Sequence, residues 1–152
     1  MSTESASGGI VFLDHTADVG LAVSAPTLPE LFIRTARGMT LLIHGTEREK
    51  CRATDPGGRE PTRIERRMSL RADDLPGLLR LWLRELLYWH ESEGVSFEDA
   101  RFGTLSETLL GALVTVTPDE HEPVREIKGV TLHGLVAERG DGGWVSQVIF
   151  DV

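Results

Sequence analysis

The chain has one cysteine, Cys51, and no long apolar segment. A single cysteine cannot form a disulfide within the chain. No apolar run approaches the roughly 20 residues that a membrane-spanning helix requires, and residues 1–9 contain no apolar stretch of the kind found in signal peptides. We therefore expect a cytoplasmic protein that has no membrane partner.

The sequence also lacks the common catalytic motifs. It has no P-loop, no G-x-G-x-x-G, no G-x-S-x-G and no H-E-x-x-H. The one cysteine and five histidines have no zinc-ligand spacing, which disfavours a zinc site. The net charge of −8 argues against an autonomous nucleic-acid binder, because such proteins normally carry a basic face. That charge suits a protein that meets a basic partner or holds a cation.

What the sequence does contain is the composition of one soluble globular domain. It has 152 residues, of which 40 % are hydrophobic and 26 % are charged, enough to bury a sizeable core. We expect residues 1–9, which are rich in serine and glycine, to be a flexible N-terminus. A single domain over residues 10–152 would follow.

Two segments have the pattern of amphipathic helices. The first begins at the capping box Thr27–Glu30 and ends at Gly45. The second begins at Asp73 or Asp74 and ends before Gly94, a residue type common just past a helix end. Apolar residues recur at helical spacing along both segments, which predicts one buried face on each.

The other segments have the texture of β-strands. Ile64–Ala72 alternates apolar and polar residues, and Phe97–Leu105 with Leu109–Val116 forms a predicted hairpin. Two later strands, Glu126–Glu138 and Trp144–Val152, are predicted to pair through a glycine-rich turn. With the two N-terminal strands this gives six or seven in all. The predicted fold class is α+β, a single domain with two amphipathic helices packed on a largely antiparallel or mixed β-sheet.

Polar residues crowd the junction between the two N-terminal strands, Ile10–Leu13 and Leu21–Ala25. Polar side chains at such a junction can converge on one point, although aspartate there often just caps a turn. Asp14 and His15 do not make a plausible catalytic dyad, because adjacent residues of an extended chain point in opposite directions. Asp18 is the second carboxylate of this junction.

Two more charged residues stand out near the C-terminus. Lys128 shares one face of its predicted strand with apolar residues, so it either extends to solvent at the sheet edge or pairs with a carboxylate. Asp151 follows an apolar run and adjoins the carboxylate of Val152. Together with Asp18, these groups offer hard oxygen ligands that suit Mg²⁺, Mn²⁺ or Ca²⁺.

At these residues the chain resembles the archease family. The specific features are the motif Leu13–Gly20 at the junction of the two N-terminal strands and the acid Asp151 near the C-terminus. The helix patterns support them. The segments that carry the resemblance are Leu13–Gly20, Thr27–Phe32 with Gly38-Met39, Asp73–Leu75 leading into Leu81–Tyr88, Ile127–Leu135 and Val148–Val152.

The resemblance implies a protein with no reaction of its own. It implies a co-activator of the GTP-dependent, RtcB-type tRNA-splicing RNA ligase, which promotes ligase guanylation and multiple turnover in tRNA splicing and RNA repair. Asp18 and Asp151 would be ligands of a divalent metal ion (Ca²⁺, Mg²⁺ or Mn²⁺), with the Val152 carboxylate as a third candidate ligand. Lys128 would be the basic residue of the same functional cluster. The partner would be the ligase, with tRNA met only through it.

Two other functions stay open at this stage. A metal-dependent hydrolase or phosphotransferase could use the same acids around its ion. A chaperone-like RNA-processing module could use the basic strand Arg63–Arg71. Turnover of a phosphoester by the protein alone would favour the first, and tight, salt-sensitive RNA binding without a ligase would favour the second.

Overall fold

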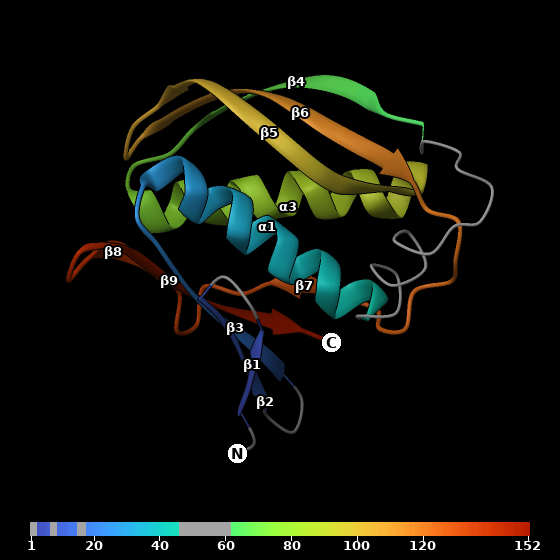
Figure 1. Ribbon diagram of the computed structural model, residues 1–152, viewed down its shortest axis with the longest axis horizontal. Helices are drawn as coiled ribbons and strands as arrows, with labels where there is room; N and C mark the ends of the chain where they lie inside the picture. The colour runs from blue at the N-terminus through green and yellow to red at the C-terminus, as the bar shows by residue number, and fades with distance from the viewer. Residues whose placement is uncertain (1–2, 7–8, 15–17, 46–61) are drawn as a thin grey trace.

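The computed structural model describes residues 3–6, 9–14, 18–45 and 62–152, and in them two helices lie between two antiparallel β-sheets (Figure 1). This confirms the predicted α+β domain with two helices packed on antiparallel sheet. The strands form two separate sheets, whereas the sequence predicted one. The first sheet holds, in spatial order, β1 (Thr3–Ala6), β2 (Ile10–Asp14), β3 (Asp18–Ala25), β9 (Gly143–Asp151) and β7 (Gly129–Val130), with β8 (Val136–Gly140) also paired to β9. The second holds β4 (Ile64–Arg71), β6 (Leu109–Pro118) and β5 (Val95–Leu105).

Both helices begin and end where the sequence predicts. α1 spans Leu28–His44, and the Thr27 side chain accepts a hydrogen bond from the Glu30 N–H at 3.3 Å. α3 spans Leu75–Glu93, with Asp74 as its capping residue. Gly94 ends α3 in the left-handed conformation, with φ of 66°. Among the described residues neither helix is long and apolar enough to cross a membrane.

The core is centred on aromatic contacts between the two helices and the second sheet. Trp82 of α3 is fully buried, and its ring centroid lies 6.0 Å from that of Phe32 in α1. The same indole lies 5.8 Å from Phe97 and 5.5 Å from Phe102, both in β5. Its Nε1–H donates a hydrogen bond of 3.0 Å to the Phe32 carbonyl. One side chain therefore joins three elements of the fold.

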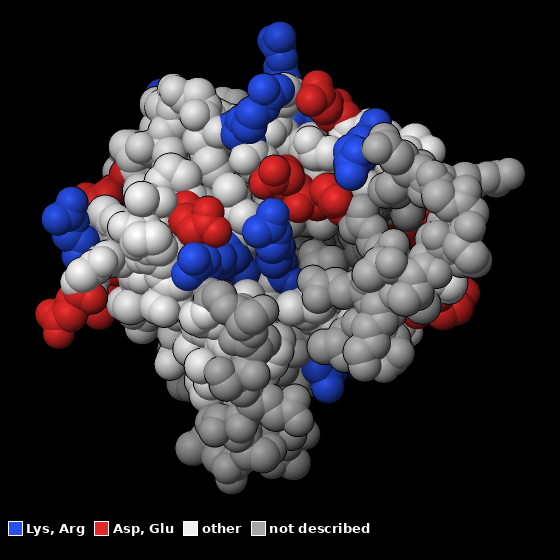
Figure 2. Space-filling view, viewed as in Figure 1, with Lys and Arg blue, Asp and Glu red and all other residues white. Residues whose placement is uncertain are grey.

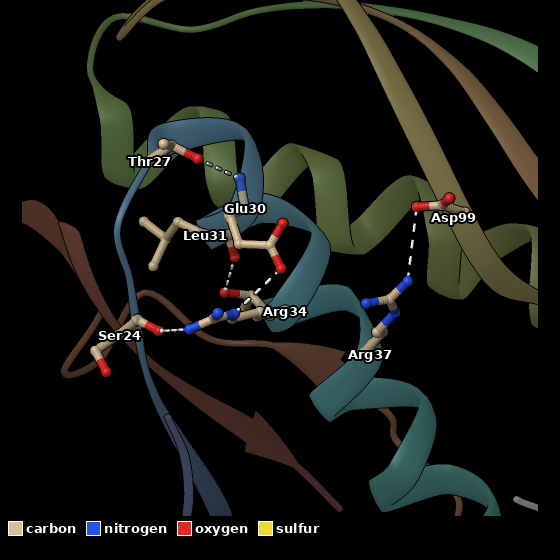
Figure 3. Close-up of polar contacts among 8 residues, drawn as sticks. Ser24, Thr27, Glu30, Leu31, Arg34, Arg37 and Asp99 are labelled. Atoms are coloured by element: carbon tan, nitrogen blue, oxygen red, sulfur yellow. Dashed lines mark hydrogen bonds and ion pairs between the residues drawn. The ribbon is translucent and has the colours of Figure 1, made fainter. Parts of the chain in front are cut away.

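Polar contacts fix the start of α1 against its neighbours (Figure 3). Arg34 donates hydrogen bonds to the Glu30 carboxylate at 3.2 Å and to the Ser24 carbonyl at 2.8 Å. One turn further along, Arg37 pairs with Asp99 of β5 at 3.6 Å. Among the described residues of this face, basic and acidic side chains are intermingled and form no large area of one sign (Figure 2).

The strand predicted over Glu126–Glu138 is interrupted. Only Gly129–Val130 and Val136–Gly140 pair with β9, and residues 131–135 form a turn between them. Gly134 takes a positive φ of 67° in this turn, and the Gln147 side chain donates a 3.0 Å hydrogen bond to its carbonyl. Alternation of residue types does not reveal such a turn, because both halves still pair with the same strand. The predicted hairpin of β8 and β9 is present.

The N-terminal segment 1–9, expected to be flexible, contains a strand. Thr3–Ala6 form β1, which pairs antiparallel with residues 10–13 of β2. The sequence of this strand, Thr-Glu-Ser-Ala, has no apolar alternation. Its pairing uses the backbone edge of β2, which the sequence pattern does not report.

We expect Gly143→Ala to destabilise the fold by roughly 1–3 kcal/mol. A Cβ at Gly143 would lie 2.3 Å from the carbonyl oxygen of Ala25, and that backbone cannot move without disturbing β3. Gly103→Ala is the matched control, because a Cβ at Gly103 has no neighbour within 4 Å. Urea unfolding of both variants would measure the difference. Equal stabilities would contradict the close contact between β9 and the end of β3.

Candidate functional site

Three of the predicted site residues, Asp18, Lys128 and Asp151, lie close together at one end of the first sheet. This is the end at which β3 begins and β9 finishes. In the sheet register the Cα of Asp18 is opposite that of Asp151. On the other side of β9, Asp151 is opposite Gly129 of β7. The Lys128 N–H donates a 2.7 Å hydrogen bond to the Asp151 carbonyl. The fold thus brings together residues from both ends of the chain, next to the C-terminus (Figure 1).

The two carboxylates lie on the same face of the sheet. Their neighbours Val19 and Phe150 are buried against the helices, so the alternation of a strand places Asp18 and Asp151 on the opposite, outer face. Directly opposed residues of an antiparallel pair have Cβ atoms about 4.5–5.5 Å apart. Two acidic groups are therefore side by side at the sheet end.

This arrangement can hold a divalent cation. Within the described part of the chain, no hydrogen bond or ion pair joins either carboxylate to another side chain. Like charges directly opposite each other destabilise a sheet, and a cation bound between them would remove that repulsion. Gly129 has no side chain beside Asp151, and a Cβ there would meet nothing within 4 Å. The donor set is all oxygen, which suits Ca²⁺, Mg²⁺ or Mn²⁺.

The other predicted residues have mixed outcomes. Val152 is half-buried and packs against the core, next to Asp151 in the chain. Lys128 is exposed and lies outside any strand, so the expectation of a lysine on an apolar strand face is wrong. The chain turns after Val130, so the predicted apolar face does not continue, and Leu132 is 70 % exposed. Asp14 ends β2 opposite Val19, and His15 lies outside the described residues.

Sequence reasoning missed one residue that positions the site. Arg80 of α3 is half-buried, and its Nε–H donates a 2.9 Å hydrogen bond to the carbonyl of Val130 in β7. This contact ties the short strand next to Asp151 to the helix layer. The helical pattern shows only that Arg80 lies beside the apolar face of its helix. No neighbouring residue in the sequence indicates that its partner is Val130.

A second polar cluster lies elsewhere, where both helices end. His44 Nε2 is 3.2 Å from Asp119 Oδ1 and 2.9 Å from Ser96 Oγ, while His90 Nδ1 is 2.9 Å from Asp119 Oδ2. The Ser96 hydroxyl also donates to Asp119. Although burial acts to raise it, hydrogen bonds from the two rings and the hydroxyl bring the pKa of Asp119 well below its ordinary range. The four residues come from α1, α3, β5 and the residue after β6, so sequence spacing does not reveal the cluster.

Comparison with known proteins places the chain in a family. Residues 11–152 match the model of the Archease protein family (MTH1598/TM1083). The archease of Methanosarcina mazei is 33 % identical over 148 residues, covering 93 % of this chain and 94 % of that one. The archease of Pyrococcus furiosus is 30 % identical over 149 residues, covering 91 % and 95 %.

A solved structure agrees with these relatives. The solution structure of Methanobacterium thermoautotrophicum protein 1598 superposes with a TM-score of 0.70 at 28 % identity, covering 95 % of this chain and 99 % of that chain. Residues 11–152, which the family model matches, include both helices, the second sheet and the sheet end that carries Asp18 and Asp151. The chain therefore belongs to the archease protein family.

Proposed function

We propose that this protein is a cytoplasmic co-activator, without a reaction of its own, of the GTP-dependent, RtcB-type tRNA-splicing RNA ligase. It promotes guanylation of the ligase and repeated turnover, and it meets tRNA only through the ligase. Asp18, Asp151 and the Val152 carboxylate hold a divalent metal ion, which is Ca²⁺, Mg²⁺ or Mn²⁺. Lys128 acts beside them.

The observation that supports this proposal is the meeting of Asp18, Lys128 and Asp151 at one exposed sheet end. A bound divalent ion supplies positive charge that can meet the phosphates of a guanylate. The two carboxylates place that charge at the outer face of the sheet. Lys128, whose N–H binds the Asp151 carbonyl, is exposed, and its ammonium can donate hydrogen bonds to phosphate oxygens. The net charge of −8 disfavours independent RNA binding, so access to RNA is left to the ligase.

The basic strand Arg63–Arg71 uses one of its arginines to hold the fold together, which reduces the charge it offers to RNA. Arg66 pairs with Glu93 of α3 and stacks on the ring of Trp89, 5.4 Å from its centroid. Glu65 of the same strand pairs with Arg101 at 3.7 Å. One of the three arginines of β4, Arg66, is thus neutralised within the protein, and the strand also carries an acid, Glu65.

The deciding experiment is a guanylation assay with the cognate ligase, GTP and a divalent metal ion, followed over many turnovers. We expect a large gain in turnover when the protein is present, because the ligase then regains guanylate after each reaction. Asp18→Ala and Asp151→Ala should each abolish the gain while the protein remains folded. Asp141→Ala removes an exposed acid in the turn that precedes β9 and should leave the gain unchanged.

The outcomes separate the alternatives. Unchanged stimulation by the folded Asp151→Ala variant would remove the metal site from the proposal. No stimulation of an active ligase by the unsubstituted protein would refute the co-activator role. Phosphoester turnover by the protein alone would then indicate a hydrolase.

Arg80→Ala should reduce the stimulation several-fold without abolishing it. Loss of the hydrogen bond to Val130 frees β7, and with it the backbone that holds Lys128 against Asp151. A hydrogen bond from a charged donor contributes about 1.5–3 kcal/mol when buried, and less for this half-buried guanidinium. Arg84→Ala, one turn further along α3 at an exposed position, is the control. Equal activity of the two variants in the guanylation assay would exclude a positioning role for Arg80.

A further inference from the structure

We propose that His44, His90 and Asp119 form a second metal site, which binds a divalent transition-metal ion of the Zn²⁺ type. Two imidazoles and one carboxylate are the ligand set of many catalytic zinc sites, and imidazole favours Zn²⁺, Co²⁺ or Ni²⁺ over Ca²⁺ or Mg²⁺. This chemistry differs from that of the all-oxygen site at Asp18 and Asp151. The inference therefore stands apart from the proposed co-activator function.

The distances suit such an ion. One candidate ligand atom from each of the three residues lies within 4.8 Å of the other two. Zinc bonds of about 2.0–2.1 Å in a tetrahedron place ligand atoms roughly 3.3 Å apart. His44 Nε2 is already 3.2 Å from Asp119 Oδ1. Only small side-chain movements would bring the three groups around one ion.

The ligands are held in place before any ion binds. His44 is the last residue of α1 and its side chain is 4 % exposed, and His90 lies in the last turn of α3. The two rings meet edge to face with centroids 5.4 Å apart. Asp119 follows β6 directly, and its N–H donates a 2.8 Å hydrogen bond to the carbonyl of Gly94. An ion bound here would tie the ends of both helices to the second sheet.

The site also has an open side. His90 and Asp119 line a pocket of about 690 Å³. Five acidic residues and one arginine are among its lining residues, so the pocket concentrates cations. A solvent molecule can enter from this side and complete the coordination, as in zinc sites with three protein ligands.

The hydrogen bonds seen within the cluster correspond to its metal-free form. In that form each ring nitrogen that faces Asp119 lies within hydrogen-bond distance of its carboxylate, so a proton on that nitrogen is donated to the carboxylate. When the ion binds, each of these nitrogens gives up its proton and the other nitrogen of the same ring takes one. The ion thus replaces two hydrogen bonds with two coordinate bonds to the same nitrogens.

Metal titration of a double variant tests the proposal. Asp18→Asn with Asp151→Asn removes the carboxylates of the first site, and the purified protein is stripped with EDTA before Zn²⁺ or Co²⁺ is added. We expect one equivalent of Zn²⁺ in competition with a chromophoric chelator, and visible Co²⁺ absorption. A further His90→Gln or Asp119→Asn substitution should lower Zn²⁺ affinity by more than about tenfold, since even outer-shell changes cost that much.

Two control substitutions make the result specific. His121→Gln alters another histidine of the same pocket, and Ser96→Ala disturbs the hydrogen bonds but keeps all three ligands. Both should retain binding. Equal affinity of the His90→Gln variant, or a double variant that binds no Co²⁺ with visible absorption, would overturn the proposal.

Histidine ¹⁵N NMR tests the same site in a chain whose pocket is unaltered. Addition of Zn²⁺ to the Asp18/Asp151 double variant should shift the imidazole nitrogens of two histidines and leave the other three unchanged. Unchanged spectra of all five would refute the site even if a ligand substitution prevents folding. Loss of ligase stimulation plays no part in this test, so failure of the second site and failure of the co-activator role are distinguishable.

Discussion

Trp82→Ala should lower the free energy of unfolding by about 3–5 kcal/mol, the range measured for large aromatic residues in protein cores. The indole is fully buried and contacts both helices and β5, so the cavity left behind cannot close without moving three elements. The substitution also removes the Nε1–H donor to the Phe32 carbonyl. A loss of this size is a large part of the 5–15 kcal/mol that typically stabilises a domain.

Urea unfolding followed by circular dichroism would measure the effect of Trp82→Ala. Tyr88→Ala is the control on the same helix, because Tyr88 is 61 % exposed and its loss should change stability by less than about 0.5 kcal/mol. Trp82→Phe should give an intermediate loss, since it keeps the ring contacts and removes the hydrogen bond. A Trp82→Ala variant as stable as the Tyr88→Ala variant would contradict the central place of this residue in the core.

The helices were predictable from sequence because their signals are local. The capping side chain of Thr27, the capping carboxylate of Asp74 and the left-handed Gly94 act within one turn of the helix end. The same holds for the hairpin of β5 and β6, whose strands are separated by a short polar turn. Elements defined by neighbouring residues can be predicted without knowledge of the rest of the fold.

The sites depend on contacts between distant segments, and there the sequence is less informative. The sequence offers Asp18 and Asp151 as candidate oxygen ligands and the family resemblance gives them one role, but only the register of β3 with β9 sets them opposite each other. The contact of Arg80 with Val130 has no local signal, because the carbonyl belongs to a strand fifty residues away. His44 and His90 have no ligand spacing along the chain, yet the ends of the two helices bring their rings together.

Asp119→Ala should destabilise the metal-free protein by roughly 2–4 kcal/mol at neutral pH, because it leaves buried polar partners without their acceptor. The side chains of His44 and Asp119 are only 4 % and 11 % exposed, so water replaces the lost contacts poorly. Asp119→Asn keeps the shape and one acceptor oxygen and should cost less. Glu120→Ala removes the neighbouring, exposed acid and should have little effect.

The pH dependence of stability gives an independent check of the Asp119 cluster. The folded-state pKa of Asp119 is held below its value in the unfolded chain, which is about 3.9 for an ordinary aspartate. Its contribution to stability is therefore complete above that value and declines as the pH falls below about 4. Unfolding free energies measured in EDTA should accordingly show the gap between the unsubstituted protein and Asp119→Asn narrowing below pH 4. A gap that stays constant down to pH 2 would mean that the carboxylate gains nothing from its charge in the folded protein, and that the two histidines and Ser96 do not act as its donors.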